Sequence, residues 1–242
     1  MAGKTGAPAN IFGGIKPPFI LIGKEMARII IVGNGRIDGR FASTIDAADL
    51  VVRLDDCRSQ GIAGTRTDIV AVRNFGQPAG SMLASRKWQS QAAVQQATEI
   101  WGLSDPKKFN AIRPLVAVLH PELRDFCDDH SGEFDRLCAA TSKVFRVVDE
   151  RLHDWVDDAL RFYGPGPYLV PSSEIILVAA VLDRFPRANV TIIGLEHSGP
   201  AYHPFAAERR LVDEYVAVGK LRRLEFAPHR WPKSVQVAES HW

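Results

Sequence analysis

The sequence predicts an α/β fold, with one Rossmann-like domain in which a mostly parallel sheet is flanked by helices. Two observations support this prediction. Short apolar runs alternate along the chain with longer segments that have the periodicity of helices. The 242 residues also contain no internal repeat and no low-complexity linker between these segments, so we expect one sheet to run through the whole domain.

Seven segments are candidate strands, because each is short, rich in β-branched or other apolar residues, and bounded by polar or turn-forming residues. They are Ile29–Val32, Leu50–Leu54, Ile69–Val72, Leu115–Leu119, Val144–Val148, Val190–Ile193 and Leu221–Phe226. We expect helices to fill the gaps between them, as parallel strands require crossover connections.

Two helices are indicated most clearly. In the first, apolar residues recur at spacings of three and four, and the segment ends at the Gly-Pro-Gly-Pro turn 164–167. The second runs from Ile175 to Leu182 and follows Pro171-Ser172-Ser173, where serines are typical of a helix N-terminus. The apolar face of the first helix comprises Leu152, Trp155, Val156, Ala159 and Leu160.

The composition argues for a small partner molecule. Thirty basic and twenty-eight acidic residues give a formal net charge of +2, which is too small to indicate a nucleic-acid-binding protein. The hydrophobic content of 46% and charged content of 24% are ordinary for a globular protein. No apolar run approaches the ~20 residues that cross a bilayer.

Three cysteines, Cys57, Cys127 and Cys138, follow no metal-ligand or disulfide spacing, and we therefore expect a reducing, cytoplasmic environment. The first residues are rich in glycine and proline and lack the pattern of a signal peptide. We expect residues 1–27 to form a flexible N-terminal arm and residues 28–242 to form the single domain.

The turn after the first strand has the composition of a nucleotide-binding loop. Gly33-Asn34-Gly35, with Gly39 following, places flexible backbone and free amides where a phosphate usually binds. The spacing is close to the dinucleotide fingerprint, with Asp55 near the position of a ribose-binding acid, so an NAD(P)-binding protein is one alternative. About fifteen residues separate Gly35 from Leu50, which is short for the helix of that fold.

Three segments together resemble the motifs of the sialyltransferases, glycosyltransferase family 29. Arg28-Ile-Ile-Ile-Val-Gly-Asn-Gly35, Thr44-Ile-Asp-Ala-Ala-Asp-Leu-Val-Val-Arg-Leu-Asp55 and Gly64-Thr-Arg-Thr-Asp68 resemble the large sialyl motif. Pro171-Ser172-Ser173 and the helix after it resemble the small motif, and Ala201-Tyr-His-Pro-Phe-Ala-Ala-Glu208 resembles the very small motif. The resemblance implies a GT-A-like variant of the α/β fold in a short bacterial form.

The resemblance also implies donor-binding residues. Asn34 would contact the CMP moiety of a CMP-sugar, and Ser172 and Ser173 would bind its phosphate and nucleoside. Two positions depart from the family pattern. Asp55 replaces an asparagine and cannot donate a hydrogen bond, and Glu174 replaces a glycine beside the expected phosphate.

The resemblance assigns His203 as the general base for the acceptor hydroxyl, with Glu208 orienting the backbone or the imidazole. His197 corresponds to a second family histidine that contacts the donor phosphate. Asp55 and Asp56 are adjacent, and we expect adjacent strand residues to point to opposite faces, so that they would not bind one ion together. The implied enzyme needs no metal and no cofactor other than its CMP-sugar donor substrate.

The sequence therefore predicts an inverting transferase that moves sialic acid, or a related ulosonic acid such as Kdo, from a CMP-sugar to a hydroxyl of a glycan or glycolipid acceptor. One alternative is a nonenzymatic nucleotide-binding or accessory protein on the same fold, because short bacterial proteins similar to this one carry the label of urease operon accessory protein. The departures at Asp55 and Glu174 favour this alternative. The NAD(P)-binding protein is the other.

Overall fold

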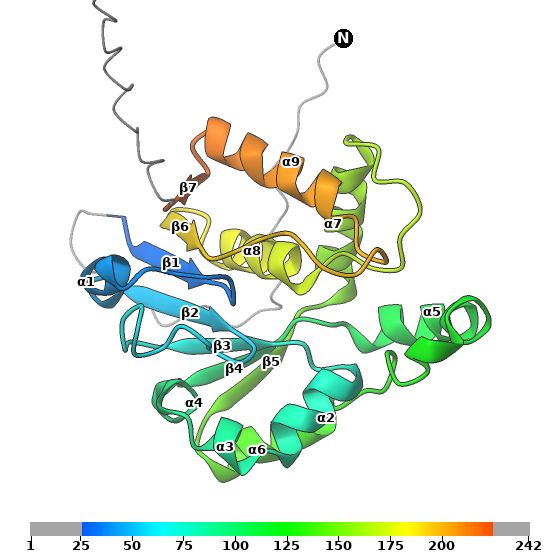
Figure 1. The fold of residues 1–242 in the computed structure, drawn as a ribbon, viewed down its shortest axis with the longest axis horizontal. Helices are drawn as coiled ribbons and strands as arrows, with labels where there is room; N and C mark the ends of the chain where they lie inside the picture. The colour runs from blue at the N-terminus through cyan, green and yellow to red at the C-terminus, as the bar shows by residue number, and fades with distance from the viewer. Residues whose placement is uncertain (1–25, 225–242) are drawn as a thin grey trace, which may run out of the picture.

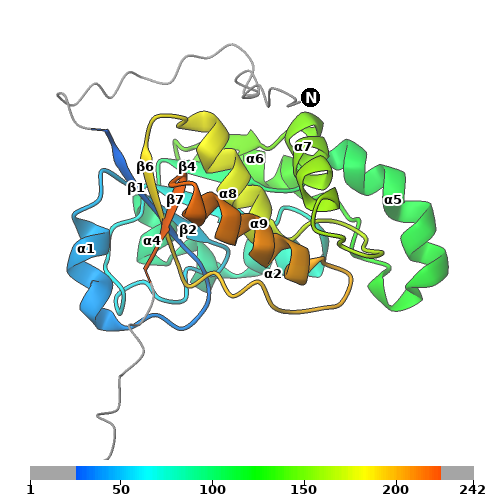
Figure 2. The same ribbon diagram turned by 90° about the horizontal axis from the view of Figure 1, so that it is seen from above.

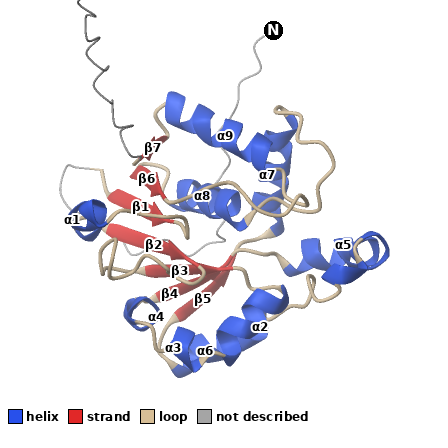
Figure 3. Ribbon diagram, in the orientation of Figure 1, coloured by secondary structure: helices blue, strands red, loops and turns tan. Residues whose placement is uncertain are grey.

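The computed structural model describes residues 26–224, which form one α/β domain around a seven-stranded sheet (Figures 1 and 3). All neighbouring strands are parallel, in the order β5-β4-β3-β2-β1-β6-β7. This confirms the predicted fold class. The strands are β1 (Arg28–Val32), β2 (Leu50–Leu54), β3 (Ile69–Val72), β4 (Glu99–Gly102), β5 (Val144–Val147), β6 (Asn189–Ile193) and β7 (Leu221–Arg223).

Helices cover both faces of the sheet, because the central strands bury side chains on each face. On one face Ile29 and Ile31 of β1 pack with the apolar sides of α7, α8 and α9. On the other, Ile30 and Val32 pack with α1, while Val70 and Val72 of β3 pack with α2, α3, α4 and α6. The α-helices are α1 (Ala42–Asp46), α2 (Gly76–Ala84), α3 (Arg86–Gln89), α4 (Ala92–Gln96), α5 (Pro106–Leu119), α6 (Ser131–Ala140), α7 (Glu150–Arg161), α8 (Ser173–Arg184) and α9 (Phe205–Ala217), with 3-10 turns at Gly39–Phe41 and Pro121–Leu123.

One predicted strand was wrong. The segment 115–119 is the last turn of α5, which begins after Asp105, whose side chain accepts hydrogen bonds from the amides of Lys107 and Lys108. The strand of this region is instead the four-residue β4, which was not predicted, as its Glu-Ile-Trp-Gly sequence is short and begins with a charge. Residues 1–25 of the expected N-terminal arm lie outside the described residues. The same holds for residues 225 and 226, at the end of the last predicted strand.

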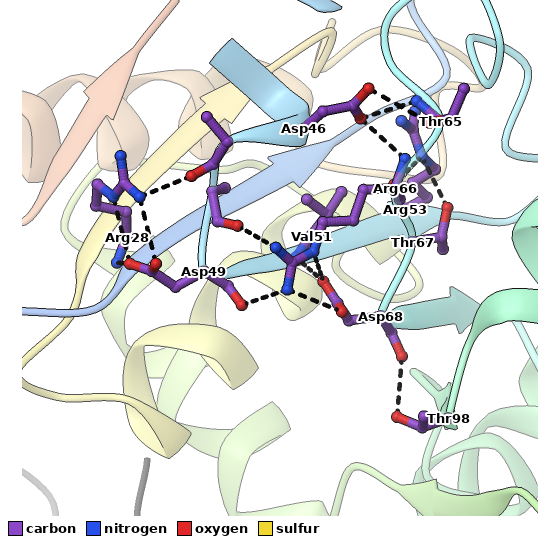
Figure 4. A network of polar contacts seen from close by, with 12 residues as sticks. Arg28, Asp46, Asp49, Val51, Arg53, Thr65, Arg66, Thr67, Asp68 and Thr98 are labelled. Carbon is purple, nitrogen blue, oxygen red and sulfur yellow. Dashed lines mark hydrogen bonds and ion pairs between the residues drawn. The ribbon is translucent and has the colours of Figure 1, made fainter. Parts of the chain in front are cut away.

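A polar network holds the loop between β2 and β3 (Figure 4). Arg53 is fully buried and donates to the carbonyls of Ala63, Gly64 and Arg66, as well as to two hydroxyls. Asp46 accepts from the amides of Thr65 and Arg66 at 2.8 and 2.9 Å. The polar residues of the large motif thus have a structural function in this chain.

Arg53→Met should lower the free energy of unfolding by about 3 kcal/mol, because it leaves several buried carbonyls without a donor. Guanidinium denaturation followed by circular dichroism measures this loss. Arg86→Met, at an exposed position of α3, is the matched control and should change the free energy by less than about 0.5 kcal/mol. Equal stability of the two variants would contradict the structural function of the buried guanidinium.

Candidate functional site

A cavity of about 660 Å³ lies at the carboxyl ends of β1, β2 and β3. Residues that follow these strands line one side of it, namely Asn34, Asp55, Asp56 and Arg73. The start of α8 and the loop before α9 line another side, with Ser172, Ser173, Glu174, Ser198, Pro200, His203 and Phe205. Residues of α2 and α3 and their flanks complete it, among them Met82, Lys87 and Trp88.

Asp55 lies deep in this wall. It has a φ of +44°, and its Oδ1 accepts from the backbone amide of Arg73 at 2.9 Å. The Arg73 guanidinium is 3.8 Å from Oδ2, and the indole of Trp88 donates to the Asp55 carbonyl at 3.1 Å. Burial raises the pKa of the Asp55 carboxyl, and the Arg73 charge opposes this rise only in part.

Asp56 also lines the cavity, but its carboxylate accepts from the Arg58 guanidinium at 3.1 and 3.2 Å, whereas the Asp55 carboxylate contacts Arg73. The strand ends at Leu54, and the left-handed backbone of Asp55 breaks the alternation of side chains that the prediction assumed. Within residues 26–224, no group of three or more histidine, cysteine or acidic side chains is placed to hold a metal ion.

Glu208 of α9 connects the start of α8 to the loop before α9. Its fully buried carboxylate accepts from the backbone amide of Ser172 at 2.7 Å and from the Ser172 hydroxyl at 2.5 Å. Its Oε2 is 3.5 Å from Nδ1 of His197. The acid that the very small motif suggested as a support for His203 therefore contacts Ser172 and His197.

His197 is buried beside two carboxylates but outside the cavity lining. Its backbone has a φ of +44°, and its amide donates to Glu174 at 2.8 Å. The Glu174 carboxylate, which is 17% exposed, also accepts from the amide of Glu196. Burial raises the pKa of Glu174, while the nearby His197 opposes the rise.

His203 lies in the cavity wall. Its Nδ1 is 2.9 Å from the carbonyl of Val170, and this contact places the proton on Nδ1, so that Nε2 is the unprotonated nitrogen of the neutral ring. Burial lowers the pKa of the imidazole, although the Val170 carbonyl opposes this. The neutral ring is therefore favoured at neutral pH.

The glycines of the first turn have a different function from the one expected. The amides of Gly33 and Gly35 are not free, because they donate to the carbonyls of Ile193 and Gly194 at 2.8 and 2.9 Å. A Cβ at Gly33 would lie 2.1 Å from the Gly194 oxygen. These glycines allow β1 and β6 to approach closely, and neither lines the cavity.

The structure thus brings Asn34, Asp55, Ser172, Ser173 and His203 to one cavity, and places Gly33, Gly35, His197 and Glu208 behind its wall. Two further cavity residues, Arg73 and Trp88, were not predicted; they lie in the sequence between the large and small motifs. Arg73 could have been found, since it directly follows a predicted strand and the carboxyl ends of parallel strands share one edge.

Asp55→Asn should reduce the pH dependence of stability. Because the pKa of Asp55 is raised above its usual 3.8, its contribution to stability is complete below that pH and is lost as pH rises through the higher folded-state pKa. Asparagine tolerates the same backbone and keeps the acceptor oxygen. We expect the difference in free energy of unfolding, variant minus wild type, to increase from pH 4 to pH 7. A difference that stays constant over this range would contradict the assignment of Asp55 as a buried acid.

No family profile matches the sequence. The chain is 46% identical over 198 residues to the urease operon 23 kDa accessory protein of Rhizobium meliloti (strain 1021). The alignment covers 81% of this chain and 92% of that protein. In the described residues, no helix is both long and apolar enough to cross a membrane.

This relationship overturns the sialyltransferase interpretation. The predicted transferase activity, the CMP-sugar donor and the glycan or glycolipid acceptor were wrong as an account of this chain. The structure gives a physical reason, since the motif residues Arg53 and Asp46 hold a loop and Glu208 binds Ser172 and His197. The chain belongs to the family of the urease operon 23 kDa accessory protein.

Proposed function

We propose that the protein is a noncatalytic accessory protein of the urease system, which acts by binding a nucleotide-like ligand in its cavity and engaging other products of the urease operon. The observation that carries this proposal is the 46% identity to the Rhizobium meliloti accessory protein over nearly its whole length. We place the protein in the cytoplasm, in agreement with three buried cysteines that form no disulfide.

The position and size of the cavity support ligand binding. The cavity lies beside the point where the strand order reverses. From β1 the chain continues outward through β2, β3, β4 and β5, and it then returns to form β6 and β7 on the other side of β1. Open α/β sheets bind ligands at such points, outside the carboxyl ends of their strands. A volume of about 660 Å³ is in the range of small-molecule sites.

The charges of the cavity suit a ligand that carries both an anionic group and several hydrogen-bond donors. Arg73 and Lys87 supply positive charge, and the first turn of α8 adds backbone amides. Asp55, Asp56 and Glu174 supply acceptors for hydroxyl or amino groups. A nucleotide combines a phosphate with ribose hydroxyls and, in cytosine or adenine, an exocyclic amino group.

The surroundings of His203 support binding without catalysis. In the Ser-His-Asp triad, a carboxylate orients the histidine that acts as general base and stabilises its charged form. Here a backbone carbonyl contacts Nδ1 of His203, and Glu208 is engaged by Ser172 and His197. The cavity therefore holds His203 as a neutral hydrogen-bonding group in its wall.

Complementation tests this function. We expect deletion of the related gene in Rhizobium meliloti to lower urease activity in cell extracts, and expression of this chain to restore it. Arg73→Gln removes a cavity charge and should restore at most about a tenth of the activity at equal protein level.

Arg86→Gln, on the exposed surface of α3, is the matched control and should restore activity fully. Unchanged urease activity after the deletion would overturn the accessory function. Full restoration by Arg73→Gln would separate the cavity from that function.

A further inference from the structure

A small inner cavity adjoins the cavity at the carboxyl ends of β1, β2 and β3, which is called the main cavity below. The inner cavity has a volume of about 10 Å³, and Arg73, Ser173 and His203 line both cavities. Buried residues of α5, α7, α8 and the segment after β4 complete its lining, among them Ser104 and His153. A polar cavity of this size has room for about one water molecule.

His153 reaches the inner cavity from α7, which lies beside α8 (Figures 1 and 2). It is 2% exposed, and its imidazole donates a hydrogen bond to the carbonyl of Leu103. In the part of the chain that the structure describes, Nε2 has no hydrogen-bond partner, so the proton donated to Leu103 is on Nδ1. Burial lowers the pKa of the imidazole, which favours the neutral ring with Nε2 as a bare acceptor.

Arg73 brings a matching donor to the same cavity. Its Nε–H is buried and also has no hydrogen-bond partner among the described residues. Its guanidinium is 3.8 Å from Oδ2 of Asp55, which is too long for a hydrogen bond. Buried donors and acceptors are nearly always paired, with protein atoms or with ordered water. A donor and an acceptor therefore line one small cavity and are not bonded to each other.

We propose that one water molecule in the inner cavity accepts a hydrogen bond from Nε of Arg73 and donates one to Nε2 of His153. A buried water makes about two to four hydrogen bonds, and Ser104 and Ser173 line the cavity as further polar residues. His153 is then a positioning residue, because it acts on a ligand of the main cavity through Arg73.

The water bridge fixes the orientation of the guanidinium. The side chain of Arg73 is 33% exposed and lines the main cavity, while its Nε is buried. A bond at Nε holds the exposed part of the guanidinium in place for the anionic group of a ligand, and such preorganisation strengthens binding. This positioning function rests on the proposed binding of a nucleotide-like ligand, whereas the water bridge itself does not.

High-resolution crystal structures of the full chain without ligand test the water bridge. We expect density for one water at about 2.7–3.2 Å from both Nε of Arg73 and Nε2 of His153. His153→Asn keeps a donor near the position of Nδ1 and removes the acceptor, so the guanidinium should lose its single orientation. His153→Gln keeps an acceptor near the position of Nε2 and should keep the bridge. Absence of the water from the wild type, or an unchanged guanidinium in His153→Asn, would overturn the proposal.

Calorimetric titration of the three proteins with CMP, CDP, UDP and NADPH tests the positioning function. Each nucleotide that binds the wild type should bind His153→Asn about fivefold more weakly, the effect of about one hydrogen bond, and His153→Gln within about twofold. A purely structural function of His153 predicts the opposite order, because His153→Gln loses the contact with Leu103 and His153→Asn keeps it.

That opposite order, or equal affinity of the wild type and His153→Asn, would reject the positioning function. If no nucleotide binds the wild type although its crystals contain the bridging water, the proposed function and the positioning function fail together, and the water bridge stands.

Discussion

The wall of the cavity depends on the buried carboxylate of Glu208. A carboxylate without solvent is costly unless it accepts hydrogen bonds, and Glu208 accepts two from Ser172 at the start of α8. The same carboxylate lies beside His197, whose amide is held by Glu174. These contacts fix α9, α8 and the intervening loop relative to one another, and so position His203 and Ser173 at the cavity.

The fold could be predicted from the sequence because its main signal is periodic. Six of the predicted strands overlap an observed one, and Ser172 caps α8 as expected, with its hydroxyl accepting from the Ile175 amide. Periodicity could not separate the apolar run 115–119 from a strand, since the Asp105 cap that starts α5 lies ten residues upstream. It also could not find β4, which contains two polar or glycine residues out of four.

Several of the predicted site residues lie together in the structure, and the ligand contacts assigned to them remain predictions. Asn34, Asp55 and His203 do lie in the cavity, because strand ends and a helix start meet there. The glycines were misread, since close approach of two backbones and binding of a phosphate favour the same residue type. The resemblance of motifs gave the architecture correctly and the chemistry wrongly. Residues such as Arg53 and Asp46 are required by the β1–β2–β3 framework, whatever the cavity binds.

The cavity lies away from the exposed apolar residues of helix α5. The cavity is lined by charges of both signs and lies at the carboxyl edge of the sheet. Leu115 and Val118 of α5 are exposed, and the helix lies at the periphery of the molecule (Figure 2).

Isothermal titration calorimetry with CMP, CDP, UDP and NADPH tests whether the cavity binds a nucleotide without converting it, when it is followed by chromatography of the nucleotide after prolonged incubation. We expect saturable binding of at least one nucleotide, about tenfold weaker binding to Arg73→Gln, and recovery of the nucleotide unchanged. Absence of binding to all four, or conversion of the nucleotide by the protein, would contradict it.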